Sequence, residues 1–358
     1  AVRDVAIVAV LPSAEARARF TPVETVSRPG SALIPGLVNA HTHNPMNLLR
    51  GVADDLPLMT WLQEHIWPVE AAVVGPQFIA DGVTLAVAEM LRGGTTCANE
   101  NYFFPDVEAA TYQRLGFRAV VGLPVAQFAN AWAASEDEYF DKAIGVHDQW
   151  RGDGLVSLAF VPHAPYTVSD AAFGRIRTLA DQLDLQVHLH THETAQEVED
   201  SVREHGQRPL ARLDRLGLVN ERLVAVHMTA VDEAEVALCA ARGVSVVHCP
   251  ESNLKLASGF CPVAKFEQAG VNLAIGTDGA ASNNDLDMFG EMRTAALLAK
   301  AVAGEATAFS ATSALRAATL GGAKAMGLDD RIGSIEPGKQ ADLALVDLSP
   351  LETQPLFN

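Results

Sequence analysis

Two histidines separated by one residue follow an apolar run near the start of the chain. His41 and His43 end the segment Gly36-Leu-Val-Asn-Ala-His-Thr-His43. In an extended strand, residues two apart point to the same side, so both imidazoles can reach one ion. Imidazole nitrogens are common ligands of zinc and related divalent ions. The pair therefore predicts two ligands of a metal site.

An aspartate and three more histidines lie at the ends of later apolar segments. Asp278 follows an apolar run, where an aspartate is costly to bury unless it is paired or bound to a metal. His188, His190 and His192 alternate onto one face of their segment, so periodicity alone does not select the ligand among them. The strand end favours His190. We expect His188 deeper in the core and His192 in the packing of a loop.

Three imidazoles and one carboxylate form a plausible site for one divalent ion. Such an ion lowers the pKa of a bound water molecule to near neutrality and makes it a nucleophile. Zinc is the expected ion, although iron and manganese suit the same ligands. Segment 156–162 has no lysine near its end that could bridge a second ion, which favours a single-metal site. The expected ligands are His41, His43, His190 and Asp278.

Three further polar residues could serve either chemistry or packing. Glu193 follows His190 by three residues, so its carboxylate can lean over the same pocket or lie solvated in a loop. His227 ends an apolar segment, where a site role and a core role are equally compatible with the sequence. For His248, a structural role is favoured.

These candidates need a fold that brings the ends of several strands together. Short apolar segments alternate with amphipathic helical segments through the middle of the chain. Eight strands that alternate with helices are typical of an α/β fold of the (β/α)₈ TIM-barrel type, in which function lies at the carboxyl ends of the strands. A doubly wound sheet would give a similar pattern. The predicted strands cover residues 34–40, 95–99, 119–123, 156–162, 185–190, 223–227, 244–248 and 271–277.

Both ends of the chain are expected to contribute to a small β-rich lobe. Residues 4–10 are predicted to form a strand, and a polar, proline-containing excursion follows over 11–33. Residues 333–347 are predicted to form a turn and a strand. The chain starts without methionine, and we expect residues to be missing at both ends, so that the second part of the lobe is incomplete. The expected division is 1–33 and 331–358 for the lobe and 34–330 for the barrel.

Composition excludes several classes of partner. The 358 residues carry a formal net charge of -18, which argues against nucleic acid and anionic membranes. No apolar stretch reaches the about 18 residues of a membrane span, and no signal peptide is present. The four cysteines are far apart, as expected for reduced thiols of a cytoplasmic protein. The sequence is compatible with a homo-oligomer but does not predict one.

Several segments resemble the amidohydrolase superfamily over essentially the whole chain. Within it, the chain is similar to the 5′-methylthioadenosine/S-adenosylhomocysteine deaminases. The matching segments are 35–43, 161–166, 190–194, 251–256 and 276–284.

The resemblance implies a role for each candidate residue. It implies a metal bound by the four expected ligands, with Glu193 and His227 beside the reacting carbon. It also implies that Trp61, Glu70 and His163 face the substrate, with Glu70 accepting hydrogen bonds from ribose hydroxyls. Without the resemblance, helix packing would be favoured for Trp61 and a solvated surface position for Glu70.

The implied reaction is hydrolytic deamination of an adenosine-type nucleoside to an inosine-type product and ammonia. Water would attack carbon 6, Asp278 would take its proton and pass one to the amine, and Glu193 would protonate the ring nitrogen. His227 would steady the attacking or developing oxygen. The alternative is another amidohydrolase reaction, such as deamination of a guanine-, cytosine- or pterin-type heterocycle or triazine hydrolysis. A catalytically inactive scaffold is disfavoured because all four ligands are present.

One segment departs from some members of the family. Those members bind the homocysteine carboxylate with arginines after the third strand, whereas Gly122–Asp141 contains no arginine or lysine. The segment instead includes Glu136, Asp137 and Glu138. This departure weakens the expectation of a preference for S-adenosylhomocysteine and leaves methylthioadenosine and adenosine as equal candidates.

Overall fold

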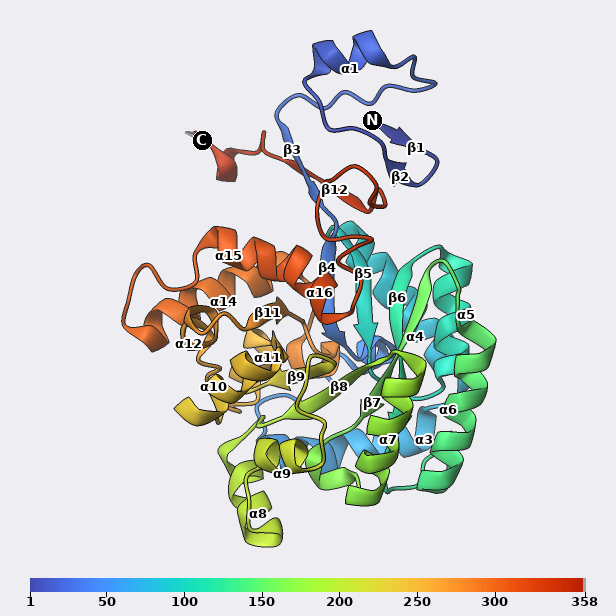
Figure 1. Ribbon diagram of the computed structural model, residues 1–358, viewed down its shortest axis with the longest axis vertical. Coiled ribbons are helices and arrows are strands. Elements are labelled where there is room, and N and C mark those ends of the chain that lie inside the picture. The colour runs from blue at the N-terminus through green and yellow to red at the C-terminus, as the bar shows by residue number, and fades with distance from the viewer. Residues whose placement is uncertain (357–358) are drawn as a thin grey trace.

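The computed structural model describes residues 1–356, and its centre is a sheet of eight parallel strands in sequential order (Figure 1). Helices surround the sheet, so the predicted (β/α)₈ barrel is confirmed. The strands of the barrel are β4 (Leu37–Thr42), β5 (Thr95–Glu100), β6 (Arg118–Val125), β7 (Val156–Pro162), β8 (Gln186–Thr191), β9 (Leu223–His227), β10 (Ser245–His248) and β11 (Asn272–Ile275).

Amphipathic helices form the outer layer, and the sequence marks several of their ends. Ser169 accepts a hydrogen bond from the amide of Ala172 at the start of α7, and Gly243 ends α10 with a φ of 72°. The helices that follow the strands include α4 (Pro76–Arg92), α5 (Pro105–Leu115), α6 (Glu136–Trp150), α7 (Asp170–Leu183), α8 (Ala195–His205), α9 (Pro209–Arg215), α10 (Glu233–Arg242), α11 (Pro250–Lys255), α12 (Val263–Gln268), α13 (Ala280–Asn283), α14 (Met288–Ala303), α15 (Ala311–Arg316) and α16 (Gly322–Ala325).

An additional helical segment lies between β4 and α4. It begins with a 3₁₀ turn and continues through a π-helical stretch, and it carries two of the predicted substrate residues, Trp61 and Glu70. Its elements are η1 (Asn44–Leu49), α2 (Leu58–Thr60), η2 (Trp61–Ile66) and α3 (Trp67–Val73). Within the described chain no single helix could span a membrane, although one bent pair, 58–73 with 76–92, meets the length and composition limits together.

The strand predicted over 34–40 is wrong in its bounds, because the apolar run divides between two sheets. Residues before Gly36 form β3 (Ser31–Pro35), which pairs antiparallel with β12 (Leu343–Asp347) outside the barrel. A Cβ on Gly36 would lie 2.0 Å from the hydroxyl oxygen of Thr96, so this crossing requires glycine. The barrel therefore begins at Leu37 and not at residue 34, and the outer limits of the lobe stay a prediction.

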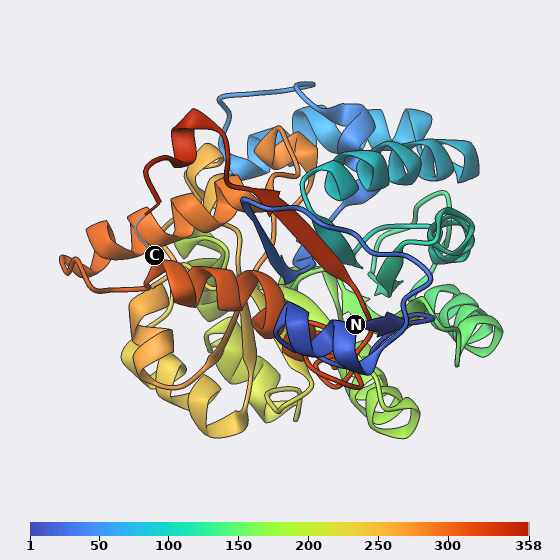
Figure 2. The ribbon, with the colours of Figure 1, turned by 90° about the horizontal axis from the view of Figure 1, so that it is seen from above.

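The N-terminal strand predicted over 4–10 is also wrong. The chain turns at Asp4, which has a φ of 54°, and two-residue strands β1 (Val2–Arg3) and β2 (Ala6–Ile7) pair antiparallel. The polar excursion that follows contains a short exposed helix, α1 (Ser13–Arg19). Figure 2 shows this N-terminal segment and β12 in front of the barrel, and β3 leads from them directly into β4 (Figure 1).

The barrel closes between β4 and β11 through a few specific contacts. Thr42 and Asp278 form a single parallel bridge, and the amide of Asp278 donates to the carbonyl of His41 at 3.0 Å. The Asn39 side chain accepts a hydrogen bond from the Thr277 amide at 2.9 Å and donates to the Thr277 hydroxyl at 2.7 Å. We call this contact between β4 and β11 the seam of the barrel. At the seam, a buried asparagine side chain replaces part of the backbone hydrogen bonding between the two strands.

Loss of the Asn39 amide should destabilise the barrel. Asn39→Ala leaves the buried Thr277 amide without its acceptor, so we expect the free energy of unfolding to fall by about 2 kcal/mol. Asn220→Ala is a matched control, because Asn220 also makes two hydrogen bonds but is partly exposed, and water can replace them. Urea unfolding of both variants measures the difference. Equal losses would contradict this account of the seam.

Glu100 at the end of β5 and Glu108 in α5 form a buried acidic pair beside the first turn after β4. Glu100 accepts hydrogen bonds from the amide of Asn44 at 3.0 Å and the hydroxyl of Tyr112 at 2.7 Å. Both oxygens of buried Glu108 lack a partner. Burial raises the pKa of Glu100 to about 7, and burial together with the Glu100 charge raises that of Glu108.

This raised pKa should make stability fall as pH rises. Between pH 4.5, the ordinary pKa, and about 7, the unfolded chain releases the Glu100 proton while the folded protein keeps it. Glu100→Gln should therefore flatten the decline of the melting temperature across this window. Melting curves recorded in chelator at several pH values measure the slope, and the exposed Glu199→Gln variant is the control. A slope equal to that of the parent protein would refute the assignment.

Candidate active site

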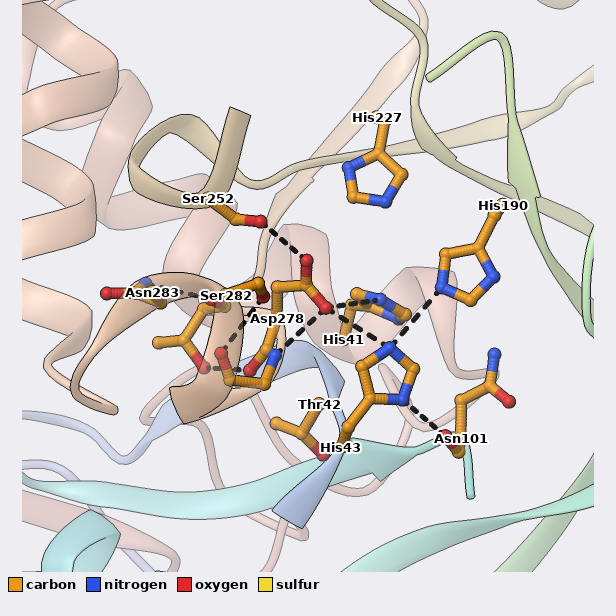
Figure 3. Close-up of polar contacts among 12 residues, drawn as sticks. His41, Thr42, His43, Asn101, His190, His227, Ser252, Asp278, Ser282 and Asn283 are labelled. Carbon is orange, nitrogen blue, oxygen red and sulfur yellow. Dashed lines mark hydrogen bonds and ion pairs between the residues drawn. The ribbon is translucent and has the colours of Figure 1, made fainter. Parts of the chain in front are cut away.

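The carboxyl ends of four barrel strands bring five predicted residues together (Figure 3). His41 lies in β4 and His43 follows it, His190 and His227 lie in β8 and β9, and Asp278 follows β11. One Asp278 oxygen, Oδ1, lies 3.3 Å from Nε2 of His41 and 3.1 Å from Nε2 of His43. Nε2 of His190 lies 3.4 Å from Nε2 of His43. The predicted ligand atoms therefore surround one point, and we call these five residues the cluster.

The outer nitrogens of two imidazoles are fixed by backbone carbonyls. Nδ1 of His43 donates to the carbonyl of Asn101, and Nδ1 of His190 donates to that of His163 at 2.6 Å. Because a carbonyl only accepts hydrogen bonds, both Nδ1 atoms carry protons, so in the neutral rings both Nε2 atoms direct lone pairs into the cluster. Two such nitrogens 3.4 Å apart need a proton or a metal ion between them.

The cluster fits a divalent ion. Two sets of three residues, His41–His43–Asp278 and His41–His190–His227, each place their ligand atoms within 4.8 Å of one another. Nε2 of His41 is fully buried and has no hydrogen-bond partner. Three imidazoles and a carboxylate suit zinc and related ions. The predicted four-ligand set stays a prediction, and the geometry adds His227 as a fifth group within reach.

The electrostatics keep Asp278 charged. Burial alone would raise its pKa, but the close contacts with the imidazoles of His41 and His43 hold it well below its usual range. Burial lowers the pKa of His41 to about 4, whereas the pKa of His43 rises to about 9 because contact with Asp278 outweighs burial. Ser252 donates to the other carboxylate oxygen at 2.6 Å and orients it.

Glu193 lies beside the cluster, in the wall of the cavity described below, and is not a solvated loop residue. Its side chain is buried, one oxygen lies 3.4 Å from the hydroxyl of Ser258, and the other lies 3.8 Å from Nε2 of His227. Burial raises its pKa above the ordinary value, and the charge of Asp278 adds to the rise. Nδ1 of His227 lies 2.9 Å from the side-chain oxygen of Asn253, which orients the ring. Two carboxyl groups whose pKa values are shifted in opposite directions thus lie near each other.

A cavity of about 710 Å³ opens from this wall. Its lining includes every cluster residue except His41, together with Glu193 and the three predicted substrate residues Trp61, Glu70 and His163. Glu70 is partly buried and accepts a hydrogen bond from Tyr102, so it is not on a solvated surface. The indole nitrogen of buried Trp61 has no partner. These placements agree with a substrate role for the additional segment between β4 and α4.

Sequence reasoning missed the aromatic part of the lining. Phe103 and Phe104 follow β5, and Phe128 follows β6, and all three face the cavity. The run Tyr102-Phe-Phe104 directly after a predicted strand end was a signal that could have found two of them. Phe128 stands alone in its segment and gives no such signal.

Three further histidines lie at or near the ends of barrel strands, and one of them makes an unexpected contact. His192 is fully buried, donates to the carbonyl of Ala230 and accepts from the amide of Leu210, as expected for loop packing. His248 is buried, and neither of its ring nitrogens has a partner. His188 lies deep in the barrel as predicted, but its Nε2 lies 2.7 Å from Nδ1 of the expected ligand His41.

Comparison with known proteins places this geometry in a family. The model of the amidohydrolase family matches residues 32–358. A 5-methylthioadenosine/S-adenosylhomocysteine deaminase of Teredinibacter turnerae is 52% identical over 98% of this chain and 79% of its own length. A 5′-deoxyadenosine deaminase of Methanothermobacter thermautotrophicus is 43% identical over 89% of this chain and 74% of its own.

A solved structure supports the same assignment. The crystal structure of an adenosine deaminase from Xanthomonas campestris with bound zinc is 74% identical, with a TM-score of 0.98. The match covers 99% of this chain and 80% of that one. The strand-end histidines and aspartate, the barrel and these matches agree: the chain belongs to the amidohydrolase family.

Proposed function

We propose that the protein deaminates an adenosine-type nucleoside by hydrolysis, with zinc as its divalent ion, and releases an inosine-type product and ammonia. The observation that carries the proposal is the position of Glu193, a buried carboxyl beside the cluster that faces the same cavity. The names of the relatives in Teredinibacter turnerae and Xanthomonas campestris, and the zinc bound to the latter, support the substrate class and the metal.

The ion, when bound by the proposed ligands His41, His43, His190 and Asp278, supplies a Lewis acid that makes water a nucleophile near neutral pH. Asp278 is ionised and accepts the proton that water loses as it attacks carbon 6. It later returns a proton to the departing amine. His227, held by Asn253, steadies the oxygen that is added to the ring.

Glu193 supplies the proton that prepares the ring for attack by water. Its pKa is raised while that of Asp278 is lowered, so Glu193 is the better proton donor of the two. Protonation of the ring nitrogen beside carbon 6 draws electrons from that carbon and favours attack. When ammonia leaves and the carbonyl forms, the hydroxyl on carbon 6 loses its proton, which restores the Glu193 carboxyl. Two carboxyl groups in one cavity therefore take opposite roles because their surroundings differ.

The rest of the cavity positions the nucleoside. Trp61 offers an apolar wall, Glu70 accepts hydrogen bonds from ribose hydroxyls, and His163 contacts the substrate from the end of β7. Tyr102 donates to Glu70 and keeps its carboxylate directed at the cavity. In this proposal, the additional segment between β4 and α4 serves recognition and the strand ends serve chemistry.

The role of Glu193 can be tested by removing its proton. Glu193→Gln should lower kcat for adenosine about 10²- to 10⁴-fold, because the amide cannot act as a general acid. Zinc content should not change, since Glu193 is not a proposed ligand. Loss of absorbance during conversion to inosine and elemental analysis measure the two quantities. Glu199→Gln, on the exposed side of α8, is the control. Retained activity in the Glu193 variant would refute the mechanism.

The charges of the cavity indicate which substituents the ribose 5′ position can carry. Within residues 1–356, its lining includes no lysine or arginine, and its carboxyl groups are Glu70, Glu193 and Asp278. Phe103, Phe104 and Phe128 give the outer part an apolar, aromatic surface. Such a surface favours neutral substituents and offers no partner for a carboxylate.

We therefore expect kcat/KM for 5′-deoxyadenosine and methylthioadenosine to exceed that for S-adenosylhomocysteine by at least about tenfold, which corresponds to about 1.4 kcal/mol. Phe128→Arg should narrow this ratio by supplying a cation near the 5′ substituent. Ammonia release from each substrate measures the ratio. Equal kcat/KM values in the parent protein would contradict the substituent preference and leave the deamination itself supported.

A further inference from the structure

A buried chain of three side chains leads from the cluster into the barrel. Nδ1 of His41 lies 2.7 Å from Nε2 of His188, and Nδ1 of His188 lies 2.8 Å from Nδ2 of Asn99. The three residues come from β4, β8 and β5, and none is more than 2% exposed. Each of the two hydrogen bonds holds one proton, which is covalently bound to one of its two nitrogen atoms.

The direction of this chain decides whether His41 can bind an ion. In the orientation that the structure has, the Asn99 amide donates to Nδ1 of His188, so the His188 proton is on Nε2 and is donated to His41. The proton of neutral His41 is then on Nε2. A protonated nitrogen has no free lone pair, so this direction is incompatible with coordination through Nε2.

Rotation of one amide reverses the whole chain. If the Asn99 oxygen faces His188, it accepts from Nδ1 of His188, and Nε2 of His188 then accepts from Nδ1 of His41. The two atoms that now lack partners, the Asn99 oxygen and Nε2 of His41, lie at the two ends of the chain. Reversal gives the oxygen a donor and frees the lone pair of Nε2 for an ion.

His41 differs in this respect from the two other imidazoles of the cluster. His43 and His190 donate to backbone carbonyls, which fix their tautomers without an alternative. His41 instead meets a second imidazole, which can donate or accept. Among the three expected histidine ligands, His41 therefore depends on another side chain for its ability to bind.

We propose that His188 and Asn99 are positioning residues for the metal site: they hold the proton of His41 on Nδ1 when an ion is bound, and the Asn99 amide turns its oxygen to His188 in that state. The inference rests on the proposed metal dependence but not on the proposed substrate. A protein that bound zinc in this way and did not deaminate adenosine would leave it standing.

Two substitutions at His188 separate positioning from packing. Glutamine has an oxygen that can accept from Nδ1 of His41 and an amide that can donate to Asn99, whereas leucine fills the space without either bond. We expect His188→Leu to weaken zinc binding about 10- to 100-fold and His188→Gln to stay within about threefold of the parent protein. Competition with a chromophoric chelator measures the affinity.

The matched control is His248→Leu, which replaces another buried histidine whose ring nitrogens have no partners. Its zinc affinity should equal that of the parent protein. If His188 served only to fill the core, leucine would keep zinc affinity, and that result would overturn the proposal. Melting temperatures in chelator show that each variant is folded before its affinity is compared.

A spectroscopic measurement tests the same proposal without any substitution. Nitrogen-15 chemical shifts distinguish the two tautomers of a neutral histidine, and we expect the zinc-loaded protein to carry the His188 proton on Nδ1. A His188 proton on Nε2 in the zinc-loaded protein would overturn the proposal, even if the leucine variant failed to fold.

Discussion

The site depends on the closure of the barrel between its first and last strands. β4 supplies His41 and leads to His43, and Asp278 follows β11, so the carboxylate meets the imidazoles only when these two strands lie side by side. The seam is narrow, since a Cβ on Gly276 would lie 2.7 Å from the backbone nitrogen of His41. Asn39 binds Thr277 in place of regular ladder bonds. The same few contacts therefore complete the fold and assemble the proposed ligands.

Burial at this seam sets the charge states that the chemistry needs. Asp278 and Glu193 are both buried at this wall, where burial raises the pKa of Glu193 and contacts with two imidazoles lower that of Asp278. In the proposed mechanism, one carboxyl group is thus the proton acceptor and the other the proton donor. A third carboxyl group, Glu70, is directed into the cavity by Tyr102. Differences in neighbours, not in residue type, separate the three roles.

The strand-end residues could be predicted from the sequence, because the period of two and the apolar runs define both the strand and its end. His41, His43, His190 and Asp278 all lie where that pattern places them. The division of the apolar run at Gly36 could not be predicted in this way, since it follows from a close approach to Thr96, remote in sequence. Phe128 escaped notice for a similar reason, because only the tertiary fold brings its loop to the cavity. Local sequence patterns predict which residues form a strand or helix. Contacts between residues distant in sequence decide which sheet or cavity that strand or helix joins.

The contact between His188 and His41 is another feature that local sequence patterns do not predict, and here it decides where single protons lie. Periodicity places His188 two residues before the expected ligand His190 and on the same face, which makes it a rival for the ion. The structure makes it a partner of another ligand instead, because a side chain one layer deeper in the barrel meets the outer nitrogen of His41. Alternation along β8 thus places the expected ligand His190 at the rim of the barrel and His188 one layer deeper. There His188 contacts the expected ligand of another strand, His41. In a closed barrel, a histidine two positions before a ligand is a natural place for such support, since inward-facing residues of different strands stack in layers.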